Sequence, residues 1–252
     1  MMDGSGKGHR VKQLGIVGGT SWHSTALYYA HLNRAVAERM GGLHSARLTL
    51  ESLDFANYTA CNAGGDSDAA TAIVVAAAKR LKAAGCDGLL LASNAMHRAV
   101  GAVASATGLP IVDIRDATAA RLAAEGRTHV ALLGTRATMT EGFAREKLSE
   151  RGIVIQELPA EWLTEVDRII GEELVLGRVT RDSQRQLKSL ITELAKQRVQ
   201  AVVLGCTELC LAVDVRANVL PVYDTTAIHA AAAVEWMLEE AGEVAEGVRA
   251  AA

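Results

Sequence analysis

LLLASNAMH (residues 89–97) and VVLGCTELC (residues 202–210) each begin as an apolar, strand-like run. Each then breaks into a turn that carries a hydroxyl or a thiol, followed by a segment with helical character. Ser93 and Cys206 hold corresponding places in the two turns and lie 113 positions apart. The two stretches therefore read as one structural unit used twice.

Other landmarks repeat at nearly the same offset. Gly18 and Gly134 are 116 positions apart, and Pro110 and Pro221 are 111 apart. Near-equal offsets predict an internal duplication. If the two halves pack about a pseudo-two-fold axis, both turns face one cleft, with the hydroxyl and the thiol on opposite sides of a bound molecule. Such a geometry suits the movement of a proton across a carbon atom.

The composition is that of an ordinary globular protein. The chain has 252 residues, of which 50% are hydrophobic and 22% charged, enough for a sizeable core. A net charge of −3 and the absence of a dense Lys/Arg run argue against nucleic acid and anionic membranes as partners. The polar start MMDGSGKGHRVKQ lacks the apolar core of a secretory signal, and no segment approaches the roughly 20 apolar residues that span a bilayer.

Cysteine usage points to a reducing compartment and to no metal site. The four cysteines form no CxxC pair and have no histidines at zinc-ligand spacing. We therefore expect a cytoplasmic protein without a structural metal.

Short aliphatic runs alternate with longer Ala-rich runs of helical period, which predicts an α/β fold with mainly parallel sheets. The predicted strands cover residues 14–18, 47–51, 87–91, 111–113, 129–133, 154–157, 201–204 and 219–223. The predicted helices cover residues 23–40, 68–84, 117–125, 138–151, 161–176, 183–197 and 226–241. We expect two doubly wound parallel-sheet domains: residues 1–115 plus 225–252, and residues 116–224.

Glycines and polar residues mark the helix ends. Glycines that follow predicted helices act as C-terminal stops, and Asp or hydroxyl residues act as N-caps. The expected stops are Gly85, Gly126, Gly152 and Gly242. The expected caps are Asp68, Thr138 and Ser183.

Four polar turns fall at the carboxyl ends of predicted strands, where doubly wound sheets bind ligands. They are GGTSW (18–22), SNAMH (93–97), GTRAT (134–138) and GCTEL (205–209). Exposed N–H groups at helix starts attract anions, so a substrate carboxylate is expected here. Simple capping explains any one turn, but four recurring turns favour a site. The predicted substrate-binding residues are Thr20, Ser21, Ser52, Asn94, Ala95, Thr135, Thr138, Thr207 and Glu208.

Cys206 is the strongest candidate for chemistry. It follows the apolar run AVVL and precedes a predicted helix, whose N-terminus stabilises a thiolate. The alternative is a buried thiol that acts as a small hydrophobe. Glu208 and Asp54 are candidates to orient the thiol or a substrate amine, with surface or capping roles nearly as favoured. His97 is expected in a supporting or packing position.

Six segments of the chain carry a resemblance to a known family: GIVGGTSWHSTALYY, GGLHSARLTLESLDF, LLLASNAMH, LLGTRATM, VVLGCTEL and VYDTTAIHA. Together they resemble the aspartate/glutamate racemase superfamily, in particular its aspartate racemase branch. The resemblance runs in order from about residue 14 to 241. It implies two pseudo-symmetric halves with the site in the cleft between them, an amino-acid or dicarboxylate substrate, no cofactor (PLP-independent) and a homodimer.

The family has two cysteines on opposite sides of the substrate α-carbon, and those positions are Ser93 and Cys206 here. Only one thiol is kept. A free thiol is a few per cent ionised near neutral pH, whereas a serine hydroxyl is essentially never ionised. Ser93 is thus a feasible proton donor and a poor base, although some family members resemble this chain in carrying a hydroxyl there. We predict a slow racemase in which α-hydrogen exchange from one enantiomer outruns inversion.

A second departure concerns the substrate. Archaeal-type aspartate racemases hold the two carboxylates with an arginine and a lysine, and Tyr58 and Thr164 align with those positions. A phenol does not replace bidentate arginine recognition, so Arg47, Arg136 or Arg168 must substitute if the substrate is acidic. The patterns LHSA (43–46) and SxDF (52–55) resemble a bacterial branch that acts on acidic amino acids. Aspartate or glutamate therefore stays the expected substrate.

Three alternatives stay open. Arylmalonate decarboxylases resemble this family and keep only the second cysteine, which protonates an enolate held by oxyanion-stabilising groups. A maleate-type cis-trans isomerase fits less well because it needs both thiols. A non-catalytic amino-acid-binding protein would have no obvious use for the complete GCTE turn, which favours catalysis.

Overall fold

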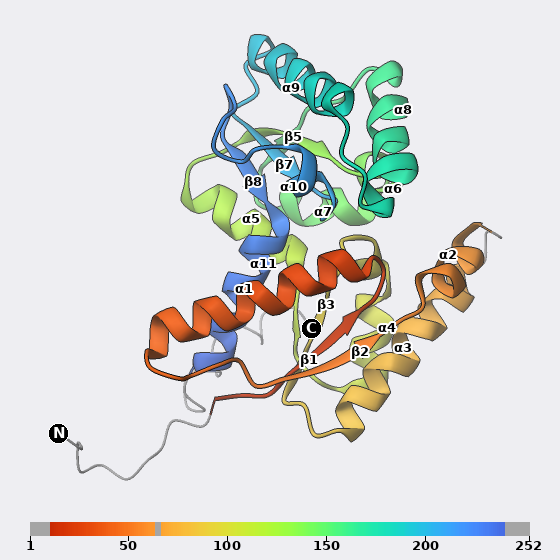
Figure 1. Cartoon of the computed structure of the whole chain (residues 1–252), viewed down its shortest axis with the longest axis vertical. Helices are drawn as coiled ribbons and strands as arrows, with labels where there is room; N and C mark the ends of the chain where they lie inside the picture. Colours follow the sequence, from red (N-terminus) through yellow and green to blue (C-terminus); the bar gives the residue numbers. More distant parts are fainter. Residues whose placement is uncertain (1–10, 64–66, 240–252) are drawn as a thin grey trace.

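The structure is a computed structural model that describes residues 11–63 and 67–239. It contains two parallel four-stranded sheets with the orders β2-β1-β3-β4 and β6-β5-β7-β8 (Figure 1). The second sheet repeats the strand order of the first, so the predicted α/β fold with two pseudo-symmetric halves is confirmed. The strands are β1 (Leu14–Gly18), β2 (Leu48–Ser52), β3 (Gly88–Leu91), β4 (Ile111–Val112), β5 (His129–Leu133), β6 (Val154–Ile155), β7 (Ala201–Leu204) and β8 (Val222–Asp224).

Helices cover both faces of each sheet, so the central strands are buried on both sides. In β3, Leu89 and Leu91 pack into one core while Leu90 packs into the core on the other face. The helical elements are α1 (Trp22–Met40), α2 (Phe55–Ala63), α3 (Ser67–Ala83), η1 (Ala95–Ala99), α4 (Val100–Thr107), α5 (Ile114–Ala124), α6 (Arg136–Thr140), α7 (Gly142–Glu150), α8 (Ala160–Arg168), η2 (Ile169–Glu173), η3 (Leu174–Leu176), α9 (Arg181–Lys196), α10 (Leu209–Ala212) and α11 (Thr225–Leu238).

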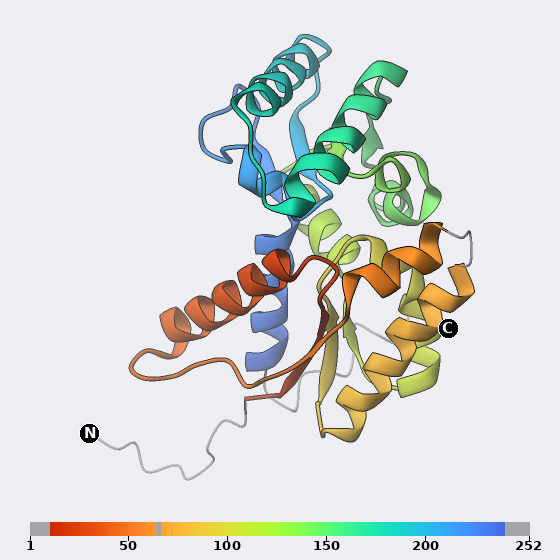
Figure 2. The ribbon, with the colours of Figure 1, turned by 45° about the vertical axis from the view of Figure 1, so that its right-hand side comes forward.

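The last described helix returns to the first half. Ala233, Val234 and Met237 of α11 share a core with Tyr28 and Leu32 of α1. Figure 2 shows α11 running from the second sheet alongside α1. The domain boundaries at 115/116 and 224/225 stay a prediction. No described helix is long and apolar enough to cross a membrane.

Both crossings between the halves use the same local device. Asp113 follows β4 and caps α5 by accepting from the backbone N of Arg115 at 2.8 Å. Asp224 ends β8 and caps α11 by accepting from the backbone N of Thr226 at 2.8 Å. These aspartates end the LPIVD and LPVYD segments, so the duplication extends to the two segments that connect the halves.

Two N-cap predictions are wrong by one turn. Thr135, not Thr138, caps α6, and Thr180, not Ser183, caps α9. In each case the earlier hydroxyl accepts from the backbone N of the later residue. Both members of each pair suit a cap, so composition alone does not decide which comes first.

Other differences concern helix continuity. The predicted helix 138–151 breaks at Glu141, whose backbone is extended, into α6 and α7. The predicted helix 161–176 continues from α8 through the π-helical η2 and the 3₁₀ turn η3. The helices α2, α4 and α10 were not predicted, and α5 begins three residues earlier than expected. Gly85, Gly126 and Gly152 follow helices with positive φ as expected, whereas Gly242 lies outside the described residues.

Candidate active site

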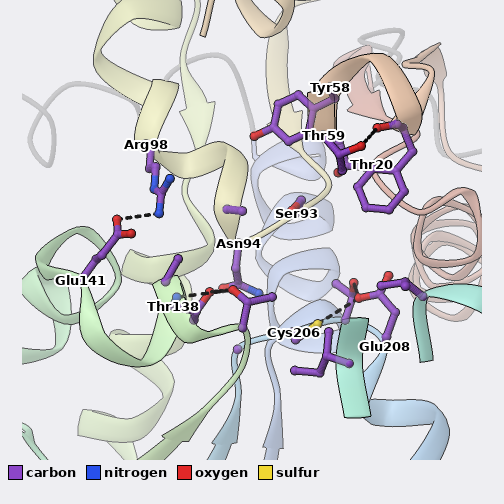
Figure 3. Close-up of a pocket in the computed structure, with 18 residues that line it drawn as sticks. Thr20, Tyr58, Thr59, Ser93, Asn94, Arg98, Thr138, Glu141, Cys206 and Glu208 are labelled. Carbon is purple, nitrogen blue, oxygen red and sulfur yellow. Dashed lines mark hydrogen bonds and ion pairs between the residues drawn. The ribbon is translucent and has the colours of Figure 1, made fainter. Parts of the chain in front are cut away.

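A cavity of about 410 Å³ lies where the carboxyl ends of the two sheets face each other. Figure 3 shows side chains from both halves directed into it. Its size suits a small organic ligand. Nine of the predicted site residues line it: Thr20, Ser93, Asn94, Ala95, Thr135, Thr138, Cys206, Thr207 and Glu208. The structure thus brings the two duplicated turns to one chamber.

Two predicted site residues do not line the cavity. Ser21 has a φ of 71°, and its carbonyl accepts from both the backbone N and the hydroxyl of Thr25, so it shapes the turn before α1. Ser52 is the last residue of β2 and pairs with Gly18 in the sheet. Asp54 also lies outside the lining. Its carboxylate accepts from the backbone N of Ala56 at the start of α2.

The turn after β1 has a steric requirement at Gly19. Its φ is +90°, and a Cβ placed there would lie 2.2 Å from the carbonyl O of Leu53. Only glycine fits this approach. The turn that follows presents Thr20 to the cavity, and the buried Thr20 hydroxyl has no hydrogen-bond partner within the described part of the chain. A buried unpaired hydroxyl is available to a ligand.

Cys206 and Glu208 form a hydrogen-bonded pair in the second half. The Cys206 thiol donates to Oε2 of Glu208 at 3.0 Å. The same carboxylate accepts from the hydroxyl of Thr207 at 2.8 Å, and its Oε1 accepts from the hydroxyl of Ser24 at 2.6 Å. Glu208 is only 5% exposed and forms no ion pair with a described residue. Hydroxyl and thiol donors therefore hold a buried carboxylate beside the sulfur.

The structure does not support the expected stabilised thiolate at Cys206. Burial, and then the charge of Glu208, raise the pKa of Cys206 well above that of a free thiol. The sulfur is buried, and α10 begins three residues later and is a single turn, so little helix dipole reaches it. The resting form is a neutral thiol with a proton acceptor already in place.

Ser93 is fixed through its backbone. Nδ1 of His97 donates to the carbonyl of Ser93 at 2.8 Å, while Nε2 of His97 accepts from the backbone N of Ile114 at 3.1 Å. Burial lowers the pKa of His97, which suits this neutral tautomer. Within the described residues, no side chain forms a hydrogen bond to the Ser93 hydroxyl. The hydroxyl faces the cavity without a base (Figure 3).

Three lining residues also have structural roles. Nδ2 of Asn94 donates to the hydroxyl of Thr225 at 3.1 Å, which ties the first turn to the start of α11. Thr135 caps α6, and its hydroxyl lies 3.1 Å from that of Thr138. For Thr135 the simple capping interpretation is therefore correct, although it also faces the cavity.

None of the three arginines expected to replace the missing cations lines the cavity. Arg47 bonds the carbonyl of Val11. Arg136 donates to the hydroxyl of Thr164. Thr164 does not line the cavity either. Arg168 pairs with glutamates of its own helical region. Tyr58 does line the cavity.

Arg98, the one cation among the described lining residues, was not predicted from the sequence. It directly follows the SNAMH turn, four positions after Asn94, a spacing that places two side chains on one helical face. That spacing was the available signal. Among the described residues, no cluster of three or more His, Cys, Asp or Glu side chains is arranged to hold a metal ion.

Comparisons with known proteins identify a matching family and similar structures. The sequence model of the Asp/Glu/Hydantoin racemase family matches residues 17–233. A candidate Asp/Glu racemase from Yersinia pestis is 40% identical, with 90% of this chain and 100% of that chain covered and a TM-score of 0.84. An aspartate racemase homologue from Pyrococcus horikoshii OT3 is 30% identical, with the same coverages and a TM-score of 0.77. The aspartate racemase of Picrophilus torridus shares the fold at 22% identity, with 90% and 94% covered and a TM-score of 0.71.

Proposed function

The chain belongs to the Asp/Glu/Hydantoin racemase family, and on that premise we propose that it racemises an acidic amino acid by moving the α-proton between Cys206 and Ser93. The family and its structures support an amino-acid racemase, which is an isomerase. One observation carries the finer proposal. A thiol and a hydroxyl at equivalent places of a duplicated turn line one cavity from opposite halves.

The thiol side acts as the base. The Cys206 proton moves to Oε2 of Glu208, which lies 3.0 Å from the sulfur, and the thiolate then takes the α-proton of the substrate. The electron pair of the broken C–H bond stays on the substrate as a carbanion conjugated with its carboxylate. Because the proton passes from sulfur to a carboxylate, no additional buried charge is created in the first step.

The hydroxyl side acts as the acid. Ser93 gives its proton to the opposite face of the α-carbon and regains one from water, while Glu208 returns the thiol proton to solvent. Return in the opposite direction needs a serine alkoxide with no described base beside it. The mechanism is therefore asymmetric, and α-hydrogen exchange from the enantiomer that faces Cys206 should outrun inversion.

An acidic substrate is supported by the relatives. The protein 40% identical to this chain is a candidate Asp/Glu racemase, and the 30% identical one is an aspartate racemase homologue. The unpaired hydroxyl of Thr20 and the polar turns around it are suited to hold the α-carboxylate. We also propose, from the family resemblance, that the protein acts without PLP, as a homodimer, in the cytoplasm.

Proton NMR in deuterated water tests the proposal. Each enantiomer of a panel of amino acids is incubated with purified protein, and the α-signal and the chirality are followed together. Aspartate or glutamate should lose its α-signal and invert, and Cys206→Ala should abolish both. Release of carbon dioxide from an aryl malonate, without exchange of any amino acid, would identify the decarboxylase instead.

A further inference from the structure

Arg98 lines the cavity and already forms an ion pair with Glu141. Its Nη2 donates to Oε2 of Glu141 at 2.5 Å, and its guanidinium carbon lies 4.8 Å from the centre of the Phe143 ring. Arg98 comes from η1 in the first half, whereas Glu141 joins α6 to α7 in the second. The ion pair therefore joins the two halves that line the cavity.

We propose that Arg98 binds the side-chain carboxylate of the substrate, and that Glu141 occupies this position until the substrate displaces it. The inference rests on the proposed function and names the group that selects for an acidic side chain. Neither the duplicated turns nor the cation positions of the aligned relatives point to this pair.

The charges of the lining support this role. Among the residues that the structure describes, Arg98 is the only cation of the lining, beside the carboxylates of Glu141 and Glu208. A dicarboxylate amino acid brings two negative charges into this chamber, and its distal carboxylate needs a charged donor. In Figure 3, Arg98 lies at the side of the pocket opposite Cys206 and Glu208, with Asn94 between them. The distal carboxylate would thus be held away from the reacting sulfur.

The geometry also favours exchange of one carboxylate for another. A cation–π contact with the Phe143 ring helps to hold the guanidinium in place. Nη2 is occupied by Glu141, while Nε and Nη1 form no hydrogen bond with any residue that the structure describes. A substrate carboxylate can use these donors and then replace Glu141, whose side chain is about half exposed and can turn to solvent. The arginine stays paired throughout.

The two members of the pair should respond in opposite directions. Binding of L- and D-aspartate and of the neutral isostere asparagine is measured by calorimetry in a Cys206→Ala background, where no turnover occurs. Arg98→Gln should weaken aspartate binding by about 10- to 100-fold, the value of a charged hydrogen bond, and leave asparagine nearly unchanged. Glu141→Gln should tighten aspartate binding by about 2- to 5-fold, since an exposed competing charge is removed.

A matched control is Arg39→Gln, which removes an inter-helix ion pair with Glu235 at 3.0 Å outside the cavity. It should change neither affinity. With Cys206 intact, Arg98→Gln should raise KM for aspartate and leave kcat within a few-fold. These readouts separate substrate binding from a purely structural ion pair, which would make both variants weaken all ligands together.

Three results would overturn the inference. They are equal affinity of the parent for aspartate and asparagine, a parallel loss in both variants, and failure of both enantiomers of aspartate to bind. If a basic amino acid binds more tightly than aspartate and its binding requires Glu141, then Glu141 and not Arg98 selects the substrate side chain, which also contradicts the inference. If Arg98-dependent aspartate binding occurs but no α-hydrogen exchanges, the racemase proposal fails and the inference stands.

Discussion

Replacing Glu208 by glutamine separates two roles of this carboxylate. In the protein it accepts the Cys206 thiol at 3.0 Å and the hydroxyls of Thr207 and Ser24 at 2.8 and 2.6 Å. Glutamine keeps the shape and one acceptor oxygen, but it has no negative charge and cannot take a proton. The variant should therefore lose the base that receives the thiol proton while the cavity stays intact.

The expected size follows from these contacts. Loss of assisted proton transfer lowers kcat by roughly 10²- to 10⁴-fold. Weaker hydrogen bonds from Ser24 and Thr207 lower the free energy of unfolding by about 1 to 3 kcal/mol. The charge of Glu208 helps to raise the thiol pKa, after burial, so its removal lowers that pKa. At a fixed pH near 8 more of the thiol is then ionised, and Cys206 reacts faster with iodoacetamide.

The assay measures both quantities on the same preparations: α-hydrogen exchange in deuterated water, and the pH dependence of alkylation at Cys206 followed by mass spectrometry. Glu173→Gln is the matched control, because Glu173 also accepts from two hydroxyl side chains, Thr180 and Ser183, but does not line the cavity. Glu173→Gln should change stability only. Unchanged exchange in Glu208→Gln, or slower alkylation, would refute the reasoning.

Three further predictions test other parts of the account. Ser93→Cys should restore a second thiol and raise the inversion rate toward the exchange rate, which a chiral assay beside NMR measures; an unchanged ratio would count against Ser93 as the acid. Gly19→Ala should lower the free energy of unfolding by more than about 3 kcal/mol, because its Cβ would meet backbone atoms of Leu53 at positive φ. Gly42 also has positive φ but faces open space, so Gly42→Ala should lower the free energy of unfolding by only about 1 kcal/mol. Urea denaturation measures both values. Burial, and then the electrostatic effect of His97, lower the pKa of His229 to about 3. The unfolded histidine takes up a proton near pH 6.5, whereas the folded one does not. The free energy of unfolding should therefore fall as the pH is lowered from 6.5 toward 3. His229→Gln should flatten that part of the stability curve, and an unaltered curve would exclude His229 as its source.

Much of the fold follows from the sequence because parallel strands buried on both faces read as continuous apolar runs. The bounds of β1, β5 and β7 agree with the prediction. The edge strands β4 and β6 are only two residues long, and their ends depend on pairing with a single neighbour. Short helices such as α10 carry too few periods of hydrophobicity to be recognised.

Most of the predicted residues line the cavity, whereas the electrostatics of the cavity were not predicted. Local turn chemistry identified nine of the lining residues, because the duplication itself marks them. The raised pKa of Cys206 depends on burial and on where α10 begins, and neither is encoded in the adjacent residues. The interpretation of Arg98 depends on its ion pair with Glu141, which lies 43 positions away in the sequence and belongs to the other half of the protein.

The most direct test of the mechanism is the rate of α-deuterium incorporation into D- and L-aspartate, measured separately by NMR with the unsubstituted protein. We expect one enantiomer to exchange clearly faster than it inverts, and Cys206→Ala to stop exchange from both. Equal and rapid exchange from both enantiomers, or exchange that survives the loss of Cys206, would contradict proton transfer between a thiol and a hydroxyl.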